Sequence, residues 1–139
     1  LEILYTPSAM IIAQAVIATP IVMGISLAAM QQLPRKLRLQ ILALGATRLQ
    51  MVLILIREAR LALLAAVMAG FGGVISEVGA SIMVGGNIKG YTRVLTTATV
   101  METSRGNFDV AIALSVILLL FAYLINLVLT TIQQRERPR

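Results

Sequence analysis

Three long runs of apolar residues, at about 9–30, 61–84 and 110–132, dominate the hydropathy pattern of the chain. The first contains no charged residue, and the second contains one acid, Glu77. About 20 apolar residues in a helix cross the ~30 Å hydrocarbon core of a bilayer. The pattern therefore predicts an all-α integral membrane protein, a polytopic helical bundle with three spans in this chain.

Small residues are ordered along the second run. They lie four apart in two rows, Ala62–Ala66–Gly70 and Ala65–Ala69–Gly73. Such rows let helix backbones approach closely in lipid, so we expect this helix to pack against other helices of the subunit or of a second copy. In the first run, Pro20 is expected to bend the helix because proline removes a backbone donor.

The polar segment between the first two runs, at about 31–60, carries six basic residues and one acid. Its apolar residues recur at helical spacing, and Gly45 interrupts that spacing midway. We expect two short helices around a turn at Gly45–Ala46. The alternative is an amphipathic helix that lies on the membrane surface without a partner.

The loop at about 85–107 begins with the glycine-rich turn 85–90 and continues with a hydroxyl-rich stretch, 91–101, that is too short and too polar to span. Basic residues concentrate in the 31–60 loop and in the C-terminal tail from Gln133. Because basic excess marks the cytoplasmic side, we expect these two segments to be cytoplasmic and the 85–107 loop to be external.

Composition agrees with lipid as the solvent. The 139 residues are 58% hydrophobic and only 13% charged, with a mean hydropathy of +0.90. The net charge of +6 arises from residues between and after the spans, so we read it as orientation and not as nucleic-acid binding. Neither Cys nor His is present, so no metal site and no thiol or imidazole catalysis is expected.

Several motifs after the basic loop resemble one transporter family. They are Arg57-Glu-Ala-Arg60, Gly70-Phe-Gly72, Ser76-Glu-Val-Gly79, Val84-Gly-Gly-Asn-Ile88, Thr92-Arg-Val-Leu-Thr-Thr97 and Glu102-Thr-Ser-Arg-Gly106. Together they resemble the tungstate-type permeases of the molybdate/tungstate/sulfate group of ABC importers. The resemblance covers nearly the whole chain.

This resemblance implies a type I importer permease, a multi-pass protein of a bacterial or archaeal cytoplasmic membrane, that moves an oxyanion, most readily tungstate. It implies a homodimer, two ABC ATPase subunits and an extracytoplasmic substrate-binding protein as partners. ATP and magnesium would bind the ATPase, so this chain needs no cofactor and is not itself an enzyme. The chain begins at Leu1 without a signal-peptide pattern, and we expect further spans to precede it.

The segment Ile41–Arg48 resembles the EAA loop, with which such permeases contact their ATPase. Gly45 matches the family's glycine, whereas Leu39-Gln-Ile41 replaces Glu-Ala-Ala and Arg57-Glu58 replaces Leu-Pro. The predicted coupling residues are Arg38, Leu42, Gly45, Ala46 and Arg48.

A dianion that crosses a low-dielectric region needs hydrogen-bond donors and, at the entrance, positive charge. The predicted path and external gate comprise Ser76, Glu77, Ser81, Asn87, Arg93, Thr96, Thr97 and Thr99, with Lys89 at the rim. A free carboxylate would repel the anion, so we expect Glu77 to be paired with Arg93, Arg105 or a backbone N–H. Alternatively, Glu77 lies among headgroups, the hydroxyls bond only helix carbonyls, and the path follows Gln14, Thr19 and Ser26.

Other functions remain open at this point. Molybdate and sulfate permeases share the architecture, and the binding protein usually selects the ion. An ion channel would not need the basic helix–turn–helix loop. A membrane enzyme would need an acid/base or nucleophile pair, and Glu77, Glu102 and Asp109 have no His or Cys partner.

Overall fold

The computed structural model of the chain describes residues 3–135, and this part is all-helical, as predicted. Its helices in chain order are α1 (Pro7–Gln31), α2 (Arg35–Ala43), α3 (Arg48–Glu58), α4 (Arg60–Ile75), α5 (Gly79–Gly85), α6 (Leu95–Ser104) and α7 (Phe108–Arg135). Residues 136–139 of the predicted basic tail lie outside the described residues.

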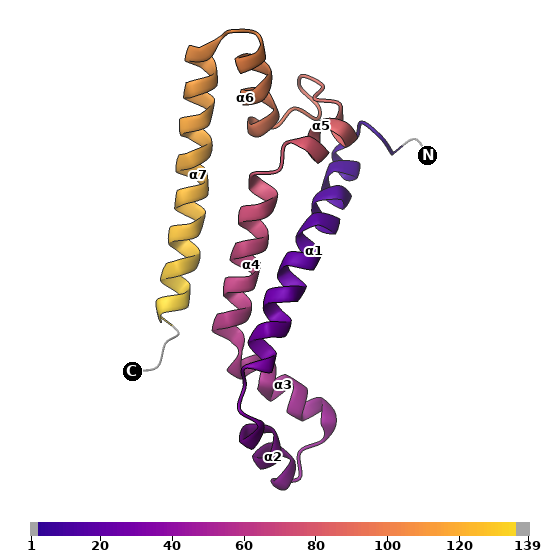
Figure 1. Ribbon diagram of the computed structural model, residues 1–139, viewed down its shortest axis with the longest axis vertical. Helices are drawn as coiled ribbons and strands as arrows, with labels where there is room; N and C mark the ends of the chain where they lie inside the picture. Colours follow the sequence, from indigo (N-terminus) through magenta and orange to yellow (C-terminus); the bar gives the residue numbers. More distant parts are fainter. Residues whose placement is uncertain (1–2, 136–139) are drawn as a thin grey trace.

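The long helices α1, α4 and α7 run along the molecule's long axis, with the α2–α3 hairpin at one end and α5 and α6 at the other (Figure 1). By length and apolar composition, α1 and α7 can each cross a membrane, and α4 with α5 can form a third, broken span. These helices coincide with the three predicted runs. The predicted cytoplasmic loop and external loop lie at opposite ends, as alternating spans require.

The contact between α1 and α4 is close because glycines remove side chains from it. A Cβ atom added at Gly70 would lie 2.4 Å from Val22 Cγ2, and one at Gly73 would lie 3.0 Å from Ile21 Cδ1. Ala66 is completely buried in the same contact region. The prediction of small-residue packing is confirmed for these positions, whereas Ala62 and Ala69 are exposed in this chain.

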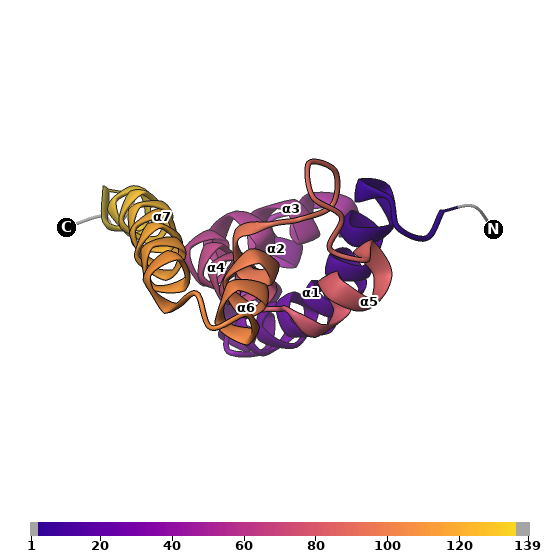
Figure 2. The same ribbon diagram turned by 90° about the horizontal axis from the view of Figure 1, so that it is seen from above.

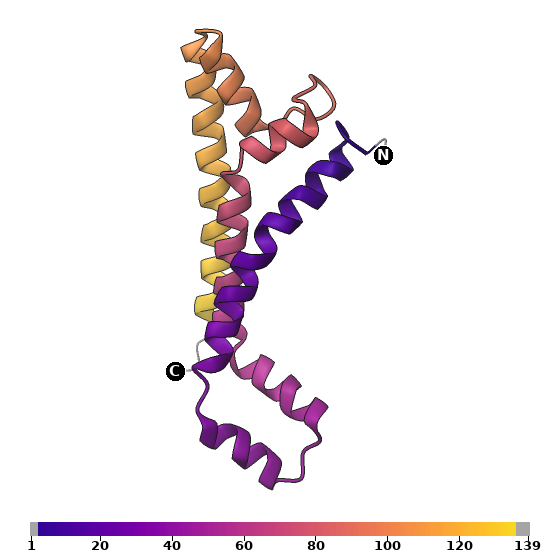
Figure 3. The same cartoon turned by 45° about the vertical axis from the view of Figure 1, so that its right-hand side comes forward.

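Helix α1 is continuous but curved, and its upper half diverges from α4 (Figure 3). Pro20 lies within it and has no N–H to donate to the carbonyl one turn earlier. The hydroxyl of Thr19 donates to the Ala15 carbonyl at 2.6 Å, a bond that also favours bending. The predicted effect of Pro20 is therefore consistent with the observed curvature.

The second predicted span is not one helix. It breaks after Ile75, and α5 continues at 63° to α4. The expectation that 61–84 is one helix was therefore wrong, although α4 and α5 together can still form one broken span. Hydropathy did not predict the break, because residues 76–78 lie inside an apolar run. The break arises because the side chains of Ser76 and Glu77 form local hydrogen bonds that compete with those of a continuous helix.

The hydroxyl-rich stretch, which was not predicted to be helical, forms α6 and packs against α7. A turn joins these two helices, and there Glu102 accepts hydrogen bonds from Arg105 Nη1 at 3.1 Å and Asn107 Nδ2 at 2.8 Å. The bond from Asn107 is the main cause that lowers the pKa of Glu102 below its usual value, and the Arg105 charge acts in the same direction. The sequence did not predict this helix because it is rich in threonine, whose intrinsic helix propensity is low.

The basic loop forms the predicted helix–turn–helix. Gly45 in the turn has φ +81°, a left-handed conformation that favours glycine. Thr47 begins α3 with a reciprocal capping box, in which Gln50 N donates to Thr47 Oγ1 and Thr47 N donates to Gln50 Oε1. The hairpin projects beyond the long helices, so both of its helices are accessible (Figure 3).

The glycine contact between α4 and α1 can be tested by substitution. We expect Gly70→Leu to destabilise the protein by ~1–3 kcal/mol through overpacking against Val22. Gly72→Leu should be nearly neutral, because a Cβ atom there meets nothing within 4 Å. Thermal unfolding in detergent measures both. Adding Val22→Ala should restore part of the loss in Gly70→Leu; a double variant no more stable than Gly70→Leu would contradict this packing.

Candidate functional site

The break between α4 and α5 is capped on both sides. The Ser76 hydroxyl lies 3.1 Å from the Gly72 carbonyl and 3.0 Å from the Gly73 carbonyl, two acceptors at the end of α4. Glu77 Oε1 accepts the N–H of Ala80, in the first turn of α5, at 2.9 Å. Of the three partners predicted for Glu77, the structure therefore shows the backbone N–H. The Glu77 carboxylate therefore caps the N-terminal end of α5.

Helix α5 is fastened to α1. Gln14 Nε2 donates to Ser81 Oγ at 3.3 Å, and Ser81 Oγ donates to the Glu77 carbonyl at 3.2 Å. Gly85 allows close approach, because a Cβ atom there would lie 2.6 Å from Met10 Sδ. Ser81, predicted to line the path, is 2% exposed and lies inside this contact. Its hydroxyl links α1 to the break.

Hydrogen bonds hold the segment between α5 and α6 in a compact loop. The Thr92 hydroxyl donates to the Gly85 carbonyl at 2.5 Å and accepts the Ile88 N–H at 2.9 Å. Asn87 has φ +51°, and Arg93 holds it by donating from Nε to its side-chain oxygen at 3.2 Å and from Nη2 to its carbonyl at 3.3 Å. Arg93 therefore fixes the loop and does not pair with Glu77.

The three predicted path threonines of α6 have different surroundings. Thr97 is fully buried and caps the helix start by accepting the Val94 N–H at 3.1 Å. Thr99 donates to the Leu95 carbonyl at 2.9 Å, one turn earlier. Within residues 3–135, the Thr96 hydroxyl makes no hydrogen bond. Thr96 thus has a hydroxyl that remains free to bind something else.

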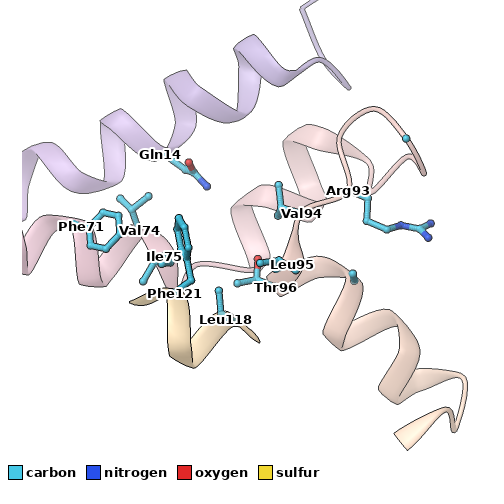
Figure 4. A pocket seen from close by; sticks show the side chains of 12 residues that line it. Gln14, Phe71, Val74, Ile75, Arg93, Val94, Leu95, Thr96, Leu118 and Phe121 are labelled. Atoms are coloured by element: carbon cyan, nitrogen blue, oxygen red, sulfur yellow. The ribbon is translucent and has the colours of Figure 1, made fainter. Parts of the chain in front are cut away.

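Thr96 lines a cavity of about 700 Å³ between α1, α4, the 90–94 segment, α6 and α7. The lining residues are Gln14, Phe71, Val74, Ile75, Gly90, Arg93, Val94, Leu95, Thr96, Ala98, Leu118 and Phe121. Figure 4 shows Gln14 and Thr96 approaching from different sides, whereas the Arg93 guanidinium points away from the cavity. None of these lining residues is acidic, so no carboxylate in the wall would repel an anion.

The predicted residues thus separate into groups. Of the residues predicted to line the path, Thr96 and Arg93 line the cavity, although the Arg93 guanidinium points away from it. Ser76 and Glu77 cap the break between α4 and α5. Ser81 lies in the contact of α5 with α1, and Asn87 lies in the loop that follows α5. Gln14, which belonged to the alternative path, shares the cavity with Thr96. The aromatic wall of Phe71 and Phe121 was not predicted. Their positions in two apolar runs gave no signal that distinguishes a cavity from a lipid-facing surface.

Comparison with known proteins identifies the family. The protein-family model described as "Binding-protein-dependent transport system inner membrane component" matches residues 2–139 of the chain. The chain belongs to this family. The resemblance expected from the sequence motifs is confirmed, and so is a multi-pass location in the inner membrane.

Curated relatives of this inner membrane component bear related names. The tungstate uptake system permease protein TupB of Peptoclostridium acidaminophilum is 41% identical over 134 residues, which are 96% of this chain and 59% of that protein. A probable anion ABC transporter permease protein of Haloferax volcanii is 42% identical over 130 residues, 90% and 56% of the two chains. TupB of Campylobacter jejuni is 37% identical over 126 residues, 91% and 53%.

The inner membrane component described here spans a little over half the length of these relatives. No solved structure matches it. The family therefore rests on sequence, and the geometry of the break, the loop and the cavity comes from the helices described above.

Hydrogen exchange can test whether Arg93 of this component acts through its bonds or its charge. Lysine keeps the charge, but it has one nitrogen and cannot reproduce the two hydrogen bonds that Arg93 Nε and Nη2 donate to Asn87. We expect Arg93→Lys and Arg93→Met to speed amide exchange at 88–93 alike, by about tenfold, as loss of a charge-assisted bond implies. Lys89→Met, which removes an exposed cation from the same loop, should leave exchange unchanged. Parent-like protection in Arg93→Lys would show that charge alone suffices.

Proposed function

We propose that the chain is part of the membrane-spanning permease subunit of an ABC importer for a tetrahedral oxyanion, with tungstate as the first candidate. The observation that carries the proposal is the cavity with the Gln14 amide and the free Thr96 hydroxyl in its wall. Two relatives are named as tungstate uptake permeases and one as a probable anion permease, which supports the same substrate class.

The chemistry of the wall suits such an anion. A tetrahedral oxyanion accepts hydrogen bonds, and amide and hydroxyl groups can donate them. A carboxylate 4 Å from the ion would cost about 4 kcal/mol per unit charge at an effective dielectric constant of ~20. Glu77 instead binds the Ala80 N–H beside the cavity. Two donors do not replace the hydration of a dianion, so we infer that a second copy of the subunit supplies others.

Coupling to ATP hydrolysis belongs to the other end of the molecule. We infer that α2 and α3 dock on an ATPase subunit, which holds ATP and magnesium, while a substrate-binding protein delivers the anion at the α5–α6 end. Leu42 and Arg48 are exposed on the hairpin and available for this contact, and Ala46 is half-buried beside Gly45. Arg38 has another partner, because its Nη2 donates to the Met30 carbonyl at 3.1 Å.

The full-length permease, reconstituted with its ATPase and binding protein in proteoliposomes, tests the function. Tungstate should drive both ATP hydrolysis and anion uptake, and unlabelled molybdate and sulfate should rank the alternative substrates by competition. Neither uptake nor stimulated hydrolysis with any of the three anions would refute the proposed function.

Substitution of the cavity donor gives a sharper test. We expect Thr96→Val to slow tungstate uptake by about tenfold, because a hydrogen bond to a charged group contributes ~1.5–3 kcal/mol. Thr99→Val is the matched control, since its hydroxyl already bonds the Leu95 carbonyl, and its uptake should stay near that of the parent. Equal rates in Thr96→Val and the parent would place the anion path elsewhere.

The turn of the coupling hairpin can be tested at Gly45. A β-branched residue resists φ +81°, with a cost of about 1–3 kcal/mol, so Gly45→Val should displace α2 from α3. We expect a folded permease that retains less ATPase subunit on co-purification and loses tungstate-stimulated hydrolysis. Gly45→Asn should be milder, because asparagine tolerates this conformation. If Gly45→Val retains the ATPase subunit and its stimulation fully, the hairpin is not the docking element.

A further inference from the structure

The end of α1 that faces the coupling hairpin is fastened to α2. The last carbonyls of a helix lack intrahelical donors, and the Met30 carbonyl receives one from Arg38 Nη2 at 3.1 Å. A cation at this position also interacts favourably with the helix dipole. Only residues 32–34 connect the two helices, and Pro34 restricts that connection with φ −57°. A displacement of α2 therefore acts directly on α1.

The other end of α1 is fastened to α5. Gln14, roughly 24 Å from Met30 along the helix axis at 1.5 Å per residue, donates to Ser81 Oγ. Ser81 in turn donates to the carbonyl of Glu77 in the break. The contact of Gly85 with Met10 adds close packing to this polar link. Figure 3 shows α1 running without interruption from the hairpin to α5.

Helix α4 makes a poorer connection between the same two ends. It follows α3 directly, but residues 76–78 separate it from α5 with a bend of 63°. The carbonyls at the end of α4 and the first amides of α5 are capped separately, by Ser76 and Glu77. Neither of these caps joins α4 to α5, so α5 can turn relative to α4 without breaking them.

We propose that Arg38 and Ser81 are positioning residues that fasten the two ends of α1, so that motion of α2 moves α5 through α1 while the 76–78 break acts as the hinge. The proposal rests on the proposed function in one respect, the docking of the α2–α3 hairpin on an ATPase. Movement of α5 reaches the cavity through the bond between Ser81 and Gln14, because Gln14 lines the cavity. The cavity wall therefore changes when the ATPase binds or hydrolyses nucleotide.

Spin labels in the full-length permease–ATPase complex test this directly. Met83 on α5 and Val67 on α4 are both exposed, so labels there report the angle at the break. Pulsed electron paramagnetic resonance compares their distance without nucleotide and with ATP plus vanadate. We expect a shift in the parent complex, its loss in Arg38→Met, and its reduction in Ser81→Ala.

Matched variants distinguish the effect of the Arg38 hydrogen bond from the effect of its charge. Arg35→Met removes the same charge from the same helix, and no bond from Arg35 to α1 is present in the described chain, so it should keep the shift. Arg38→Lys, which retains a donor, should recover part of it. Arg38→Met combined with Ser81→Ala should lose no more than Arg38→Met alone, since residues in one path are not additive.

Several results would overturn the proposal: no nucleotide-dependent shift in the parent, a full shift in Arg38→Met, or equal loss in Arg35→Met. If Arg38→Met fails to assemble, Arg38→Lys and Ser81→Ala decide, and parent-like shifts in both overturn the proposal. The label distance depends on nucleotide and not on the transported ion. A parent complex that shows the shift but no oxyanion uptake would therefore refute the proposed substrate and leave the role of α1 standing.

Discussion

The need to satisfy backbone polar groups where a helix breaks inside an apolar run governs the arrangement of this chain. In lipid, an unsatisfied N–H or C=O costs several kcal/mol, so a break is stable only where side chains replace the missing helical bonds. Ser76 serves the end of α4 and Glu77 serves the start of α5. These two capping side chains make the 63° bend possible, and the bend carries α5 away from α4 and onto α1. A single carboxylate that appears costly in an apolar run thus has a structural partner a few residues away.

Close packing with α1 is the complementary constraint. The hydrophobic effect does not drive helices together in lipid, so contact depends on shape and on polar links. Glycines in α4 and α5 admit Val22 and Met10 of α1, and the Gln14–Ser81 bond adds a polar link at the upper end. Helix α7 packs on α6 and stands apart from α1, as the view along the bundle shows (Figure 2). Between these two groups lies the cavity, whose wall combines an apolar surface with the Gln14 amide and the Thr96 hydroxyl.

The polar side chains of the α5–α6 end serve two purposes that their residue types do not distinguish. Thr92, Thr97 and Arg93 complete the backbone of a compact loop, and Thr96 alone among the α6 threonines at the cavity keeps a free hydroxyl. The oxyanion that we propose as the substrate would meet few donors and no carboxylate in this wall, which suits passage better than tight binding. At the opposite end, Arg38 is likewise committed to a carbonyl of α1. Fixed loops at both ends and a break between α4 and α5 are the features on which the proposed transmission of motion through α1 depends.

The sequence determined the solvent, the helical class, the three apolar runs and the hairpin turn at Gly45, because hydropathy over 20 residues and a left-handed glycine are local properties. Its motifs also indicated the family correctly. It did not reveal the break at 76–78 or the helix α6, because average hydropathy and threonine propensity carry no information on capping partners. It could not decide which hydroxyls are free, since that depends on whether a carbonyl lies one turn away, as for Thr99, or a cavity opens beside the residue, as for Thr96. Likewise, Gln14 and Ser81 are 67 positions apart, and only the packing of α5 on α1 brings their side chains within bonding distance.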